Sequence, residues 1–133
     1  MNYCADSWFI VALFNEDPKS LDILNQTKEG KTYLSIPIIV YAESIKKLMQ
    51  RGVAKNIIDL FWQGVENSEK VNIINLNKSI GEEAAKISLS NNVPLIDSFV
   101  AATCKLTNCD YLLTGDDDYS VLVKKKYIKI YSW

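Results

Sequence analysis

The stretch YCADSWFIVALFN, residues 3–15, joins a short apolar segment to a longer one through a single acid. Residues 3–5 predict a brief strand that ends at Asp6. From Ser7 to about Asn15 the chain is apolar enough for a buried helix. A strand that leads directly into a helix is the repeating unit of α/β folds, so we expect the rest of the chain to follow it.

The same alternation of short apolar runs and longer helical patterns continues towards the C-terminus. Further strands are expected at residues 33–36, 71–76, 111–114 and 127–131. Helices are expected at residues 18–28, 37–50, 53–67, 79–90 and 97–108. Pro37 suits the first turn of its helix, and Ser79 with Glu82 fits a capping box. This order predicts an α/β fold with a mostly parallel sheet.

A length of 133 residues fits one domain that spans residues 1–133. The net charge of −1 argues against a domain that grips nucleic acid through overall basicity. It is compatible with an enzyme that meets phosphate through bound divalent ions. The cysteines Cys4, Cys104 and Cys109 lack metal-ligand spacing, which favours buried free thiols in a reducing compartment. No segment resembles a signal peptide or a membrane span, so we expect a cytoplasmic protein.

Four acids, Asp6, Glu43, Asp97 and Asp116, each interrupt or directly follow an apolar stretch. A carboxylate in such a setting is costly unless it pairs or binds a cation. The chain has no His, so a metal would be held mainly by oxygen, which points to Mg²⁺ or Mn²⁺ and phosphate chemistry. Sites in open parallel sheets form beyond the carboxyl ends of the strands, where Asp6 and Asp116 are expected.

Each acid also has a local explanation. Glu43 can pair with Lys46 or Lys47 at helical spacing. Asp97 and Asp6 can each cap the helix that follows, and residues 116–118 can form a solvated acidic turn. Only a shared metal site predicts that all four acids converge, because clustered like charges are destabilising until cations neutralise them.

The acids stand in a characteristic order along the chain. Asp6-Ser7 follows the first strand, Pro37 precedes Glu43 on a helix, and Asp97 stands in LIDSFVAAT (95–103). The last segment is LLTGDDDY (112–119), in which Tyr119 occupies a position where Phe is frequent. In this order and spacing the chain resembles the PIN-domain ribonucleases, specifically the VapC-like toxins of type II toxin–antitoxin systems, over essentially its whole length.

This resemblance implies a three-layer α/β/α fold with a short, mostly parallel twisted sheet, and cleavage of RNA with one or two Mg²⁺ or Mn²⁺ ions. The acidic quartet maps onto Asp6, Glu43, Asp97 and Asp116, and Asp118 is either a fifth ligand or an alternative to Asp116. Thr114 and Ser7 match supporting hydroxyls. Candidate RNA contacts are Lys46, Lys47, Arg51 and residues 124–126. The resemblance also implies an antitoxin protein as partner and a homodimer.

The hypothesis for the mechanism is hydrolysis by a metal-activated water that attacks in line and leaves a 5′-phosphate and a 3′-hydroxyl. This route needs no His base. The first alternative is a degenerate PIN fold that acts as a binding or scaffold module. The second is a receiver-like, Mg²⁺-binding phospho-acceptor domain, which would want paired acids after the first strand and a Lys after a late strand. Here Asp6 stands alone and no Lys closely follows LLTGDDD.

Overall fold

Two helices separate each strand from the next along residues 1–132, the part of the chain that this computed structural model describes. The strands are β1 (Asn2–Ala5), β2 (Tyr33–Pro37), β3 (Val71–Ile74) and β4 (Tyr111–Leu113). The helices are α1 (Ser7–Phe14), α2 (Pro18–Lys28), α3 (Ile38–Gln50), α4 (Lys55–Glu66), α5 (Lys78–Asn91), α6 (Leu95–Leu106) and α7 (Ser120–Lys124), with a 3₁₀ turn, η1, at Asp117–Tyr119. The predicted α/β class is confirmed.

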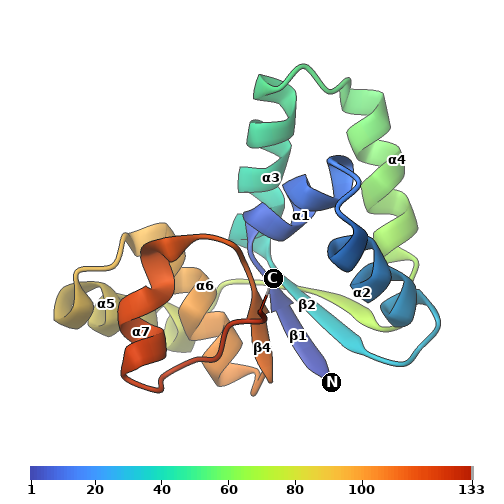
Figure 1. Ribbon diagram of the computed structural model, residues 1–133. Helices are drawn as coiled ribbons and strands as arrows, with labels where there is room; N and C mark the ends of the chain where they lie inside the picture. Colours follow the sequence, from blue (N-terminus) through green and yellow to red (C-terminus); the bar gives the residue numbers. More distant parts are fainter. Residues whose placement is uncertain (133) are drawn as a thin grey trace.

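The four strands form one sheet in the order β3–β2–β1–β4, and every neighbouring pair is parallel. Figure 1 shows α1, α2 and α4 on one side of this sheet and α5, α6 and α7 on the other, which gives three layers. Helix α3 leads away from the end of β2 and stands beside α4. The three-layer α/β/α arrangement expected from the sequence is therefore present.

Strands β1, β2 and β4 carry buried residues on both faces of the sheet. Cys4 and Ala5 of β1, Ile36 of β2 and Leu112 of β4 have no exposed surface. Parallel sheets require helices over both faces, because apolar side chains point to alternate sides of each strand. This burial fixes the register of the sheet and therefore the places where its strands end.

The predicted strand at 127–131 is wrong. Only one bridge forms there, between Leu112 and Ile130. The Leu112 N–H donates to the Lys129 carbonyl at 2.8 Å, and the Tyr131 N–H donates to the Leu112 carbonyl at 3.0 Å. Because β4 has three residues and successive residues turn their backbone groups to opposite sides, only Leu112 offers both groups to this edge.

Several predicted helix starts also shift. The capping box at Ser79 is wrong, since Asn77 caps α5 and accepts the Ile80 N–H at 2.9 Å, and Ser79 lies inside the helix. Pro37 is the last residue of β2 and directly precedes α3. Helix α4 begins two residues later than expected, and β3 ends two residues earlier. These differences move element ends and leave the order of elements unchanged.

The cysteines are free thiols, with Cys4 and Cys104 buried, as the sequence predicts. Within residues 1–132, none of the helices combines the length and the apolar composition that a bilayer crossing needs.

Candidate metal centre

The pairing of β1 with β4 places Asp6 beside Thr114. Ala5 and Leu113 are partners in register, so the next residue of each strand emerges at the same edge of the sheet. The Thr114 hydroxyl donates to Asp6 Oδ2 at 2.9 Å, and the Ser7 N–H donates to Asp6 Oδ1 at 2.8 Å. Asp6 therefore caps α1, as its local explanation predicts, and is only 3% exposed.

Glu43 reaches the same edge from α3. The Ser7 hydroxyl donates to Glu43 Oε1 at 2.5 Å. Lys47 Nζ lies 3.7 Å from the same oxygen and donates to the Ser7 hydroxyl at 2.9 Å. The predicted pairing of Glu43 at helical spacing is thus made with Lys47, whereas Lys46 is exposed on α3. Ser7 links the acid of α3 to the end of β1.

Asp97 lies in the first turn of α6, not at its cap, because the helix begins at Leu95 directly after Pro94. The Tyr119 hydroxyl donates to Asp97 Oδ1 at 3.3 Å. Asp116 caps η1 through the Asp118 N–H, and its own N–H donates to the Thr114 hydroxyl, both at 3.0 Å. Carboxylate oxygens of Asp97, Asp116 and Asp118 lie within 4.8 Å of one another.

One pocket collects these acids. It has a volume of about 280 Å³, and its acidic lining consists of Asp6, Glu43, Asp97, Asp116 and Asp118. We call it the acidic pocket. Ser7 and Lys47 line it as well, together with Pro94 and Ile96. The four quartet acids, which stand far apart in the sequence, share this pocket, and Asp116 and Asp118 both lie in it with Asp97.

The cluster disfavours its own negative charge. Burial raises the pKa of Asp6, against hydrogen bonds from Thr114 and Ser7 that lower it. Burial, a hydrogen bond with Asp118 and the neighbouring carboxylates raise the pKa of Asp97 to about 7. A divalent cation would reverse this balance, because it favours the ionised form of every carboxylate around it.

The donor set fits a hard divalent cation. Apart from the Lys47 ammonium, which binds Ser7, the polar side chains of the pocket offer carboxylate and hydroxyl oxygens, which Mg²⁺ and Mn²⁺ prefer to nitrogen or sulfur. Three carboxylates already lie close enough together to share an ion. Burial is the largest cause of the raised pKa values of Asp6 and Asp97, and neighbouring carboxylates raise them further, a cost that a bound cation would offset.

The basic residues proposed as RNA contacts fall in different places. Lys47 and Arg51 line a second pocket with Trp8 and Asp116, next to the acids. Lys124 lines a third pocket that also contains Asp116. Lys125 instead donates to the Asn91 side chain at 2.5 Å. Lys126 belongs to a pocket at Cys104 and Cys109, described below.

Sequence reasoning missed two contributions to the acidic pocket. Tyr119 does more than replace a Phe, because its hydroxyl binds Asp97 while its ring is fully buried. Gly115 lies against the Trp8 indole, so closely that an added Cβ would stand 2.6 Å from Cζ2 and 2.7 Å from Nε1. The sequence shows Gly115 within LLTGDDDY, but it does not show that this residue packs against Trp8.

We therefore expect Gly115→Ala to destabilise the fold by about 1–3 kcal/mol, the usual cost of forcing an extra methyl into a filled space. The loop between Thr114 and Asp116 or the indole of Trp8 must move to admit the methyl. Thermal unfolding followed by circular dichroism measures the effect. Gly64→Ala in α4 is the matched control, since its Cβ meets nothing within 4 Å and alanine favours helix. Equal stability of Gly115→Ala and the parent would refute the steric argument.

Comparison with known proteins agrees with this architecture. The sequence matches the PIN domain family over residues 3–125. VapBC2 from Rickettsia felis, solved with a DNA fragment from its promoter, superposes with a TM-score of 0.73 at 16% identity, covering 100% of this chain and 99% of that one. No curated protein sequence matches this chain.

Two further solved structures share the fold. The sarcin-ricin loop cleaving toxin VapC20 from Mycobacterium tuberculosis has a TM-score of 0.69 at 14% identity, with 89% of this chain and 92% of that one covered. A toxin–antitoxin complex from Klebsiella pneumoniae has a TM-score of 0.66 at 17% identity, with 89% and 90% covered. At these identities the similarity is one of fold.

Proposed function

Because the chain belongs to the PIN domain family, we propose that it is a metal-dependent endoribonuclease, the toxin of a toxin–antitoxin pair. The observation that carries this proposal is the acidic pocket, in which five carboxylates from four parts of the chain meet at the carboxyl edge of the sheet. A binding or scaffold module has no need to bear the electrostatic cost of such a cluster.

Asp97, Asp116 and Asp118 would hold one or two Mg²⁺ or Mn²⁺ ions, with Asp6 and Glu43 completing the set. When bound, such an ion polarises the scissile phosphate and lowers the pKa of an attacking water. The chain's own groups keep the carboxylates in place: Thr114 orients Asp6, Ser7 orients Glu43, and Tyr119 orients Asp97. Lys47 and Arg51 stand beside the acids to meet the phosphates of RNA.

A cleavage assay on paired substrates tests this function. RNA and DNA oligonucleotides of the same sequence are incubated with the full chain, in Mg²⁺ and in excess chelator. We expect RNA to be cut in Mg²⁺ only and DNA to stay intact. Failure to cut any of a set of structured and single-stranded RNAs would favour the scaffold alternative.

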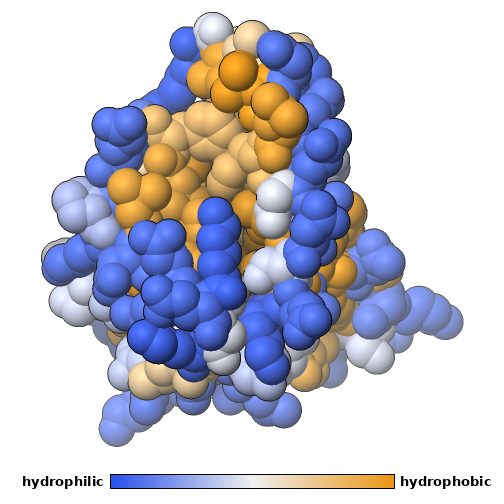
Figure 2. Space-filling model, turned by 90° about the vertical axis from the view of Figure 1, so that its right-hand side faces the viewer, coloured by the Kyte–Doolittle hydropathy of each residue, from blue (hydrophilic) through white to orange (hydrophobic). Residues whose placement is uncertain are grey.

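An antitoxin protein is the proposed partner, as in the toxin–antitoxin complex of similar fold. Its support in this chain is an apolar groove between three helices. The groove is lined by Leu13, Phe14, Leu21, Leu24, Ile57 and Phe61. Figure 2 shows, on the side that carries α2 and α4, an apolar area framed by hydrophilic residues. A groove of partly exposed apolar side chains suits a protein contact.

A homodimer is the other assembly proposed. The mass of the purified chain in solution tests it.

Ile57→Glu should weaken antitoxin binding at least about tenfold, because it buries an unpaired charge in an apolar contact. Ile57 is 48% exposed, so the fold should tolerate the change. Calorimetric titration with the antitoxin encoded beside the gene measures the affinity, and RNA cleavage should stay at the parent rate. Leu89→Glu on α5, at an 89% exposed position, is the control. Equal weakening in both variants would remove the groove from the interface.

A further inference from the structure

All three cysteines of the chain meet at one point in the fold. Cys4 lies in β1, Cys104 in the last turn of α6 and Cys109 in the loop before β4. Their sulfur atoms lie within 4.8 Å of one another, although 100 residues separate the first from the second. We call this group the thiol cluster. It shares no residue with the acidic pocket.

The end of α6 brings two of the sulfurs together. Asn108 adopts a left-handed conformation with φ 55°, and the Cys109 N–H donates to the Cys104 carbonyl at 3.0 Å. This closure of a helix C-terminus places the side chains of residues 104 and 109 side by side. The Asp110 N–H then donates to the Asn2 carbonyl at 2.7 Å, which fixes the loop against β1 and its Cys4.

A hydroxyl group beside the cluster can donate a hydrogen bond to a thiolate. Thr107 Oγ1 lies 3.1 Å from the Cys109 sulfur. A thiolate is the form in which cysteine binds metal ions.

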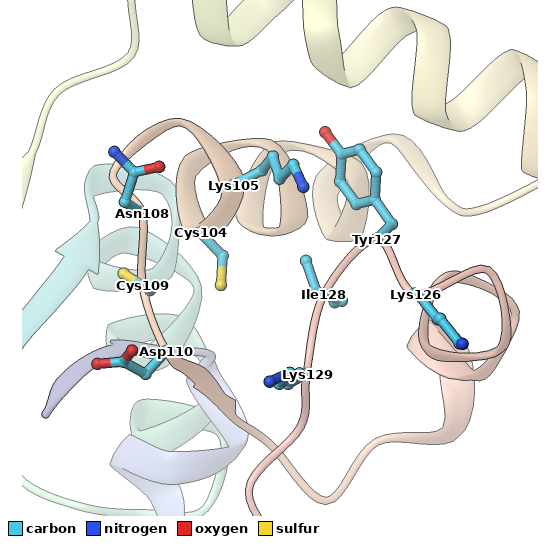
Figure 3. A pocket seen from close by; sticks show the side chains of 9 residues that line it. All are labelled: Cys104, Lys105, Asn108, Cys109, Asp110, Lys126, Tyr127, Ile128 and Lys129. Carbon is cyan, nitrogen blue, oxygen red and sulfur yellow. The ribbon is translucent and has the colours of Figure 1, made fainter.

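A pocket leads from solvent to the cluster. It has a volume of about 330 Å³ and is lined by Cys104 and Cys109 on one side and by residues 126–129 on the other. Figure 3 shows Cys104 and Cys109 on the side of α6, across from Tyr127 and Ile128. Three lysines, Lys105, Lys126 and Lys129, line the pocket against one acid, Asp110, so the surrounding charge would partly offset that of a group of thiolates.

We propose that Cys4, Cys104 and Cys109 form a second metal site, which binds one soft, thiophilic cation of the Cu(I) and Zn(II) class. Soft thiolate ligands select these ions over the hard cations proposed for the acidic pocket. At a metal–sulfur distance of about 2.3 Å, three ligands stand about 3.8–4.0 Å apart, so the observed spacing needs only small side-chain rotations. A disulfide would join two of the sulfurs and leave the third without a role.

The bound ion would link β1, which leads into Asp6, to α6, which carries Asp97. Cys4 lies on β1, two residues before Asp6, and Cys104 lies on α6, seven residues after Asp97. Seven residues of helix span about 10 Å, so the two sites are close but separate. A bound ion at the thiol cluster should therefore raise the stability of the fold without replacing Mg²⁺ or Mn²⁺ in RNA cleavage.

Metal titration of the reduced full chain under anaerobic conditions tests the proposal. Cu(I) and Zn(II) are supplied in separate arms, each buffered by a competing chelator. We expect one equivalent bound per chain, with an ultraviolet thiolate-to-copper charge-transfer band in the Cu(I) arm, and the tighter arm identifies the ion. Oxygen ligands give no such band, so in the Cu(I) arm binding at the acidic pocket is not mistaken for it. In the Zn(II) arm the serine variants make the same distinction.

Cys109→Ser and Cys104→Ser should each weaken binding by at least about a hundredfold, because each removes a ligand, and loss of an outer-shell partner alone costs roughly tenfold to a hundredfold. Cys109 is partly exposed, so its variant should fold. Asp97→Asn is the matched control and should bind the soft ion like the parent. No binding of either ion by the reduced parent, or parent-like binding by both serine variants, would overturn the proposal.

Discussion

Asp97→Asn is expected to abolish metal-dependent RNA cleavage and to raise the melting temperature of the metal-free chain. The substitution removes a carboxylate that lies with Asp116 and Asp118 around the candidate ion. Loss of metal-held stabilisation of the transition state, worth several kcal/mol, corresponds to a fall in rate of roughly a thousandfold or more. The fold gains stability because an ionised Asp97 is opposed by burial and by the acids beside it.

Asp117→Asn is the matched control for this prediction. Asp117 belongs to the same acidic run, but it is exposed and does not line the acidic pocket. Cleavage rate and thermal melting are measured for both variants and for Asp6→Asn, which should lose activity like Asp97→Asn. If Asp97→Asn and Asp6→Asn cleave at the parent rate, the acidic pocket is not the active site.

The raised pKa of Asp97 should make the stability of the metal-free fold depend on pH. The pKa of Asp97 is raised from 3.8 to about 7 in the fold, so between these values the folded chain holds a proton that the unfolded chain has lost. Stability carried by this group is complete below pH 4, falls as pH rises towards 7 and is lost above it. Asp97→Asn removes this dependence, so the difference between parent and variant isolates it.

Bound Mn²⁺ should offset, at pH 8, the stability that the fold loses when Asp97 ionises. At a free concentration a hundred times the dissociation constant, binding contributes about 2.7 kcal/mol. For a chain of this length that corresponds to a rise in melting temperature of about 8–10 °C. Asp97→Asn should gain far less. Differential scanning calorimetry at pH 5 and pH 8, with Mn²⁺ and with chelator, measures both effects. Equal shifts in parent and variant would place the ion elsewhere.

The sequence indicated that Asp6 and Asp116 follow strands, but it did not show which strands are neighbours in the sheet. Strand ends at Asp6 and Asp116 followed from apolar runs, but only the strand order β3–β2–β1–β4 makes β1 and β4 neighbours. Asp97 was expected to open its helix or to cap it, because Asp is a favoured N-cap residue. In the fold, α6 has already begun at Leu95, which moves Asp97 into the first turn.

The features that the sequence did not predict all depend on long-range packing. Trp8 meets Gly115, and the Tyr119 hydroxyl meets Asp97, across many residues of chain. The thiol cluster has no spacing motif, since its members come together only when α6 closes against β1. The prediction of a last strand at 127–131 was wrong for a related reason, because the three-residue β4 leaves one residue for pairing at its outer edge.

The chemical nature of the RNA ends tests the central claim most directly. An end-labelled RNA is cut by the purified chain in Mg²⁺, and the new ends are identified by mass spectrometry. Hydrolysis by a water activated in the acidic pocket should leave a 5′-phosphate and a 3′-hydroxyl, with no products in chelator. Products that end in a 2′,3′-cyclic phosphate, or cleavage that persists in chelator, would contradict the account.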